Sequence, residues 1–261
     1  MRKSIKLSII AVLCIFLIAS YATAVSVKTP IGINEAEKNA AAFLENPNIQ
    51  LKYEYEYKSD SGSSYVFSTG NGQVYVNMYT GTVERATFYD AKKSSESVAI
   101  DMDQAEKIAR EYAIKKYEGF DNMNMLLIES ELLNHGDGGY EYSFVYREMI
   151  DDVFSPNAVV INLNANSGDV MSYMSKHNEI VIDTKSKISR EDAIISAKAV
   201  FPKKDLKVND SYLSIEYTKP EVQSLIWVVI LEGESVDDML YGGVVVVDAI
   251  SGDVILVSPY C

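Results

Sequence analysis

Residues 245–254 read Val-Val-Val-Asp-Ala-Ile-Ser-Gly-Asp-Val, an apolar run that ends in a polar turn and a glycine. The same pattern recurs without gaps at 74–83 and 161–170: an apolar run, an Asn or Asp, and then Thr or Ser before Gly, with Val two residues later. A glycine after a polar pair between β-rich segments predicts a tight turn with positive φ. The turn glycines lie 87 and 84 residues apart: Gly81, Gly168 and Gly252. This nearly constant period predicts a repeated unit that closes in a β-hairpin, with Asp248 in the third signature.

A second motif predicts an amphipathic helix at the start of each unit. Residues 31–36, 100–105 and 188–193 each contain an apolar residue, an N-cap candidate, two variable residues, an acid or amide, and Ala. Asp101 and Ser189 have capping-box spacing to the acid or amide, whereas Gly32 is a weaker cap. Apolar residues then follow at offsets 0, 4, 7 and 8, one stripe of a 3.6-residue period: Ala36, Ala40, Phe43 and Leu44; Ala105, Ala109, Tyr112 and Ala113; Ala193, Ala197, Val200 and Phe201.

The segments between helix and hairpin predict further strands, because apolar or aromatic residues alternate there with polar ones. The alternating sets are Leu51, Tyr53, Tyr55 and Tyr57; Tyr140, Tyr142, Phe144 and Tyr146; and Leu213, Ile215 and Tyr217. Residues 225–231 predict a more continuously buried strand. One apolar and one polar face are typical of an antiparallel sheet covered on one side. For most of the 18 tyrosines we expect a packing role, and an exposed row of them would be the favoured partner surface.

The fold class predicted is therefore α+β: three tandem helix-on-antiparallel-sheet units, each a helix followed by about four strands. The units span 28–92, 98–177 and 186–260, and polar junctions at 92–97 and 184–187 separate them.

The N-terminus predicts an export signal over residues 1–24. Arg2, Lys3 and Lys6 precede an apolar run at 7–19, and Ala22-Thr23-Ala24 matches a cleavage site. The alternative is a retained membrane anchor, although the apolar run is shorter than the roughly 20 residues that span a bilayer. In either case we expect the protein in the cell envelope or outside the cell. Leu13 before Cys14 argues against lipidation, and cleavage would leave Cys261 as a single cysteine, which cannot form an internal disulfide.

The composition limits the classes of function. The chain has 261 residues, of which 48% are hydrophobic and 23% charged, as in ordinary globular proteins. A formal net charge of −13 disfavours nucleic acid as a partner, because phosphate backbones repel such a chain. Two histidines and two cysteines leave little material for metal or thiol chemistry.

The paired opening and closing motifs resemble the PepSY domain, a family named for peptidase propeptides and the spore germination protein YpeB. The resemblance covers three copies from residue 31 to residue 259; the third copy is the best match, and the first is the weakest, with Gly32 at the cap and Asn77 in place of Asp. It implies a cystatin-like α+β module, secreted or membrane-anchored, that binds or restrains a peptidase or a cell-wall hydrolase. It implies no catalytic residue and no cofactor. We therefore expect a binding protein rather than an enzyme, with membrane contact only through an uncleaved N-terminal segment.

A search for chemistry leaves one alternative. The sequence contains no H-E-x-x-H, G-x-S-x-G, P-loop or dinucleotide G-x-G-x-x-G motif, and we expect His135 and His177 on solvated loops. The pattern E-x-x-D-D occurs twice before a closing hairpin, supplying Glu148, Asp151 and Asp152, and then Glu234, Asp237 and Asp238. Clustered carboxylates suit Ca²⁺ or a carboxylate-based envelope hydrolase, and solvated loops are the simpler interpretation.

Overall fold

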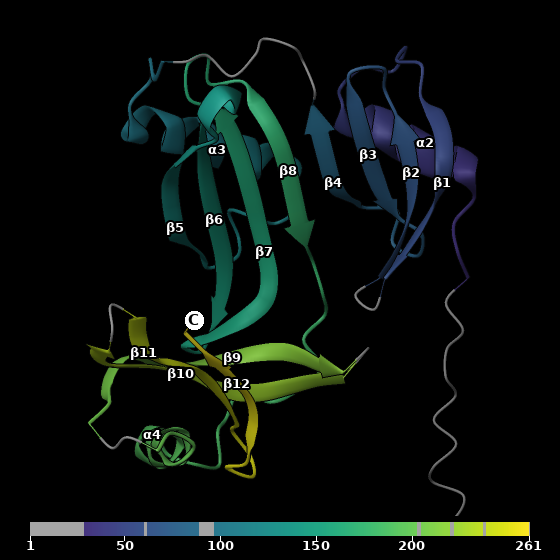
Figure 1. The fold of residues 1–261 in the computed structure, drawn as a ribbon. Helices are drawn as coiled ribbons and strands as arrows, with labels where there is room; N and C mark the ends of the chain where they lie inside the picture. The colour runs from purple at the N-terminus through teal and green to yellow at the C-terminus, as the bar shows by residue number, and fades with distance from the viewer. Residues whose placement is uncertain are drawn as a thin grey trace, which may run out of the picture.

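The computed structural model describes residues 29–59, 62–88, 97–202, 205–219, 222–236 and 239–260. The predicted export signal, Cys261, Asp237 and Asp238 lie outside these residues, and the side chain of Glu234 is not described either. Within the described ranges, no helix is both long and apolar enough to cross a membrane. The fold is mixed α+β, as predicted, with a large sheet and three helices among these residues (Figure 1).

Each helix precedes four strands. The first group comprises α2 (Ile33–Phe43), β1 (Lys52–Ser59), β2 (Gly62–Ser68), β3 (Gly72–Asn77) and β4 (Val83–Phe88). The second comprises α3 (Met102–Lys116), β5 (Met125–Asn134), the short 3-10 helix η1 (Gly136–Gly138), β6 (Tyr140–Ile150), β7 (Val153–Asn164) and β8 (Val170–Lys176). The third comprises α4 (Arg190–Ala199), β9 (Lys207–Lys219), β10 (Val222–Val236), β11 (Met239–Asp248) and β12 (Val254–Pro259).

The strands of the three groups form one hydrogen-bonded sheet, and the prediction of three tandem units did not include this pairing between their strands. Within each group the strands pair antiparallel in chain order. Strand β4 also pairs antiparallel with β8, and β7 pairs parallel with β9 through Val153↔Leu213 and Phe154↔Ser214. Figure 1 shows β9–β12 below the other strands, with α4 on their far side. Joining edges in this way satisfies backbone groups that three small separate sheets would leave unpaired.

The main core lies between α2, α3 and one face of β2–β8. Both helices touch the buried Tyr173, whose ring lies 5.1 Å from that of Phe43 and 6.1 Å from that of Tyr112. The predicted alanine stripe is fully buried in both helices, and such small residues allow close approach to the sheet: Ala36, Ala40, Ala105, Ala109 and Ala113. Helix α4 covers a separate core built on β10 and β11. Of its predicted stripe, Ala193, Ala197 and Phe201 pack in this core, whereas Val200 is the C-cap and is 41% exposed.

A salt bridge joins the ends of α2 and α3 on the helix side of the sheet. Glu45 accepts hydrogen bonds from Lys115 at 2.6 Å and from Lys116 at 2.8 Å. These bonds, that of Lys115 first, lower the pKa of Glu45 to about 2. The ammonium of Lys116 also donates to the carbonyl oxygen of Phe43 and lies 4.9 Å from its ring centroid.

The third group is attached to the second through a small polar and apolar joint. Arg147 on β6 donates from Nε to the carbonyl oxygen of Ser155 at 2.7 Å and from its guanidinium to Ser214 and Glu216 on β9. Beside it, an apolar cluster includes Val153 and Ile215, packed against Ile180 and Ile182. In the polar junction at 184–187, Ser186 donates to the carbonyl oxygen of Ala249 and accepts from the Trp227 indole.

Candidate functional site

The predicted turn glycines occupy equivalent positions in three turns. Their φ values are 74°, 75° and 83° for Gly81, Gly168 and Gly252. In each turn, the side-chain oxygen four residues earlier accepts two backbone N–H bonds of 2.8–3.1 Å; these residues are Asn77, Asn164 and Asp248. The glycine N–H donates to the carbonyl oxygen of that same residue. This is a side-chain-stabilised turn that needs glycine for its backbone conformation.

Each turn is tied to the start of the helix that opens its own group. The N–H groups of Ile31, Ile100 and Ile188 donate to the carbonyl oxygen one residue after the turn's Asn or Asp. The caps follow directly, since Asp101 accepts from the N–H of Gln104 and Ser189 from that of Asp192, while Gly32 supplies no side-chain cap. These signature residues therefore hold a hairpin against a helix terminus, and their role is structural.

The E-x-x-D-D acids at 148–152 are separated by the fold. Glu148 is buried, 8% exposed, and its Oε2 accepts from Ser155 Oγ at 2.7 Å and from Asn157 Nδ2 at 2.8 Å. Asp151 and Asp152, with φ of 49° and 64°, form the two-residue turn between β6 and β7. The interpretation of these acids as a solvated loop is therefore wrong for Glu148. Strand β7 bulges beside the Glu148 carboxylate, where the register between β6 and β7 shifts. No group of three His, Cys, Asp or Glu side chains converges as a metal site among the described residues.

The two histidines lie on different loops. His135 precedes η1 in the β5–β6 connection, and its Nε2 is 3.6 Å from Oε2 of Glu141. His177 follows β8, and its ring centroid lies 5.4 Å from that of Tyr117. Neither is positioned by a carboxylate and a nucleophile together.

The tyrosines of β1 do not share one face, which corrects the prediction of a single aromatic face there. The register shifts between Tyr53 and Tyr55, so Tyr53 pairs with Phe67 while Tyr55 and Tyr57 pair with Val66 and Ser64. Tyr53 therefore lies on the helix side, with its ring 6.0 Å from that of Phe67. The other two lie on the opposite side, and all three are 38–46% exposed, since β1 is an edge strand.

We define the open face as the side of β1–β4, β8 and β7 that points away from α2 and α3. A continuous cross-strand row runs over it, with directly paired neighbours: Tyr55, Val66, Tyr75, Arg85, Met174 and Val160. Cross-strand pairing places these side chains on one side of the sheet. The row crosses the β4–β8 seam, so two groups contribute to one surface.

A hollow of about 270 Å³ lies on this open face at the seam; we name it the open-face hollow. Its lining includes the large or charged side chains Tyr57, Tyr75, Glu84, Arg85, Met174 and Lys176. The rings of Tyr57 and Tyr75 meet edge to face at 5.9 Å, and the Arg85 guanidinium lies 5.5 Å from the Tyr75 centroid. The Glu84 carboxylate accepts from Ser64 and from Asn77, each at 2.7 Å. The hollow thus combines fixed aromatic rings, two cations and one anchored carboxylate.

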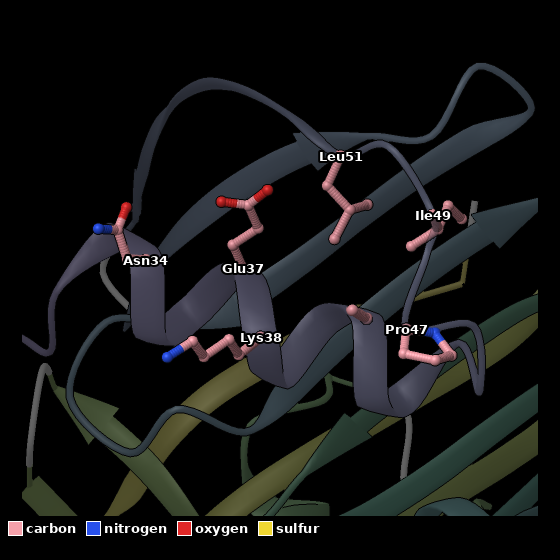
Figure 2. A pocket seen from close by; sticks show the side chains of 7 residues that line it. Asn34, Glu37, Lys38, Pro47, Ile49 and Leu51 are labelled. Carbon is pink, nitrogen blue, oxygen red and sulfur yellow. The ribbon is translucent and has the colours of Figure 1, made fainter.

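A second hollow, of about 380 Å³, lies along the outer side of α2. Figure 2 shows Asn34, Glu37 and Lys38 on the helix and Ile49 and Leu51 on the segment that follows it, all of them lining this hollow. It is larger but is built by one group and contains no aromatic ring or arginine. Because Tyr, Met and Arg are enriched in protein interfaces, the open-face hollow is the better candidate binding site.

Comparison with known proteins gives a likeness of fold. No protein-family model matches the chain, and no curated protein matches it. Among solved structures, the Bacillus megaterium YpeB C-terminal domain aligns with 89% of this chain and 99% of its own length. The TM-score is 0.51 and the sequence identity 17%, so the likeness concerns the fold alone. The fold is PepSY-like. This agrees with the fold that the opening and closing motifs imply.

Sequence reasoning missed most of the hollow. Glu84, Arg85 and Met174 lie in the second strands of the predicted hairpins, and Lys176 lies just beyond one of them, but nothing in the sequence marked these residues as neighbours. They meet only because β4 pairs with β8, and no local pattern specifies that pairing. The tyrosines were the available signal, because exposed Tyr on a strand favours a contact surface.

Proposed function

We propose that this chain is a secreted or cell-surface PepSY-type regulatory protein that binds an extracytoplasmic peptidase or cell-wall hydrolase and inhibits or regulates it, with no turnover of its own. Two observations support the family-level part: the PepSY-like fold and the three equivalent turns tied to three helix starts. On this proposal the three groups are tandem copies of one module, and the export signal places them outside the cytoplasm.

The open-face hollow carries the proposal of a binding role. Its tyrosine rings are held by each other and by Arg85, so little conformational freedom is lost when a partner covers them. Met174 adds an adaptable apolar surface. The net charge of −13 favours a partner with a basic face, and association with it should slow as salt rises.

The test is binding of the purified protein to candidate peptidases and wall hydrolases from the envelope of its host. Tyr57→Ala should weaken the complex about tenfold, because a central interface tyrosine contributes on that scale. Tyr53→Ala is the matched control: it lies on the same strand with similar exposure, 38% against 46%, but on the helix side. Equal effects of the two variants on binding would show that the open-face hollow is not part of the interface. Turnover of a peptide or glycan by the purified protein, lost in Asp151→Asn, would overturn the non-catalytic proposal.

A further inference from the structure

Three described strands have a neighbour on one side only: β1, β5 and β12. Two of these edges carry charges, which oppose pairing with another chain. Strand β1 contains Lys52, Glu54, Glu56 and Lys58, and β5 contains Glu129 and Glu131. Strand β12 reads Val-Ile-Leu-Val-Ser-Pro and contains no charged residue. It is therefore the one edge of the three that no charged side chain protects, and Pro259 at its end removes a single N–H donor.

Three neighbouring apolar side chains of β12 are exposed. Ile255, Leu256 and Val257 are 44%, 56% and 37% exposed. Val257 pairs with Val245, which is fully buried beneath α4, so Val257 lies on the helix side of the sheet. Helix α4 packs on β9, β10 and β11. It leaves Val257 incompletely covered at the edge.

The protein itself shows how such a strand can pair. The corresponding strands of the first two groups, β4 and β8, pair with each other antiparallel. The fifth residues after their turn glycines, Ala86 and Tyr173, are direct partners, and the fourth residue after each glycine pairs with the sixth residue after the other. The pairing is therefore symmetric about a local two-fold axis that passes between Ala86 and Tyr173. Both residues are buried, at 0% and 1% exposure.

We propose that two copies of this chain associate through β12 in the same way, antiparallel, about a two-fold axis at Val257. Val257 is the fifth residue after Gly252, so it would pair with Val257 of the second copy, and Leu256 would pair with Ser258. The N–H of Tyr260 donates to Gly242 on β11. Since backbone groups alternate along a strand, the N–H and C=O of Val257 point to the free edge. The two valines can then exchange both hydrogen bonds across the axis.

Self-pairing suits this edge better than the charged edges β1 and β5. An antiparallel pair of uncharged strands places no like charges opposite each other. Elsewhere, two chains of net charge −13 repel, so association through β12 should strengthen as salt rises. This is the reverse of the salt effect proposed for the peptidase or hydrolase partner, and it separates the two interactions.

Sedimentation velocity over a concentration series, at low and high salt, tests the proposal. The chain should show a monomer–dimer equilibrium, and Val257→Lys should raise the dissociation constant at least about tenfold by opposing two ammonium groups. Leu132→Lys is the matched control, because Leu132 lies on the free edge strand β5 with 38% exposure; it should leave the equilibrium unchanged. Circular dichroism establishes that both variants are folded. A monomer at every concentration, or a dimer insensitive to Val257→Lys, would overturn the proposal.

A cross-link provides a second readout that does not depend on destabilising the edge. In a chain with Cys14 and Cys261 replaced by serine, Val257→Cys should form a disulfide-linked dimer on oxidation. The expected Cα separation of directly hydrogen-bonded antiparallel partners, about 5.5 Å, lies within disulfide range. Leu132→Cys in the same background should remain monomeric. Equal cross-linking of the two variants would contradict the specific pairing.

Discussion

Two core tyrosines on β6 differ in whether their hydroxyl group is hydrogen-bonded. That of Tyr146 is buried with no hydrogen-bond partner among the described residues, whereas that of Tyr142 donates to the carbonyl oxygen of Ile100 at 2.9 Å. A buried unpaired hydroxyl costs free energy, and a paired one contributes about 0.5–1.5 kcal/mol. Tyr146→Phe should therefore leave the free energy of unfolding unchanged or raise it by up to about 1 kcal/mol. Tyr142→Phe should lower it by about 1 kcal/mol. Urea denaturation measures both, and a loss of stability in Tyr146→Phe would contradict this account.

The turn glycine of the third group allows a test of backbone conformation alone. A Cβ added to Gly252 would lie 3.7 Å from the nearest atom, Cγ2 of Ile188, so no clash results. Its φ of 83° nevertheless disfavours a β-branched residue. Gly252→Val should lower the free energy of unfolding by about 1–3 kcal/mol. Gly252→Asn should cost less, because Asn tolerates positive φ. Equal denaturation midpoints for Val and wild type would show that the turn imposes no such requirement.

At the scale of elements, the ion pair between the ends of α2 and α3 predicts a pH dependence. The pKa of Glu45 is lowered from its ordinary value of 4.5 to about 2, so the folded state binds its proton less tightly than the unfolded state. The stabilisation is therefore complete above pH 4.5 and is lost as pH falls from about 4.5 to about 2. Glu45→Gln should lower Tm slightly at neutral pH, and this difference should shrink over that window and at high salt.

The control for this prediction is Glu37→Gln, on the outer side of α2 beside the hollow of Figure 2. It should change Tm less than Glu45→Gln at neutral pH. A Tm difference for Glu45→Gln that is constant from neutral pH to pH 2 would show that the two lysines do not stabilise the carboxylate.

The elements themselves were largely predictable because their signals are local. Asp101 and Ser189 are close in sequence to the N–H groups that they cap, and each turn contains its own glycine and side-chain acceptor. The β1 bulge was not predictable, since the alternation of 51–57 is the same with or without it. The register of β1 is decided by its contact with β2, in which Tyr53 pairs with Phe67 and therefore lies on the helix side. The spacing of the tyrosines therefore could not predict which of them lie on the open face.

At the scale of the whole molecule, Arg147 is the main polar link between the second and third groups. Its bonds to Ser214 and Glu216 stand beside a parallel pairing of only two residues per strand. Arg147→Met should lower the free energy of unfolding by about 1–3 kcal/mol and let the third group melt separately. Calorimetry would then resolve two transitions, and hydrogen exchange would quicken in β9. Lys219→Met, at the exposed end of β9, is the control and should change neither; a melt in Arg147→Met as cooperative as wild type would contradict this role.

The joining of the groups was the part that the sequence did not predict. A period of about 85 residues is compatible with three separate sheets or with one shared sheet, because edge pairing depends on strands far apart in the chain. Apart from being apolar, Ala86 and Tyr173 have no feature in the sequence that indicates that they pair. Consequently the open-face hollow, which exists only where β4 meets β8, was beyond sequence reasoning, although its tyrosines were not.

The pairing of β4 with β8 also affects how the chain folds while it is being synthesised. A ribosome completes β4 long before Ser172–Met174, the residues that pair with it, have been made. During that interval the first group exposes an unpaired strand edge and the part of its core, including Phe43, that Tyr173 later covers. The final docking of β8 joins contacts that are distant along the chain, and such steps are slow. The nascent protein is therefore most prone to aggregate and most dependent on chaperones in this window, and a chain arrested just before β8 should be captured more readily than one arrested just after it.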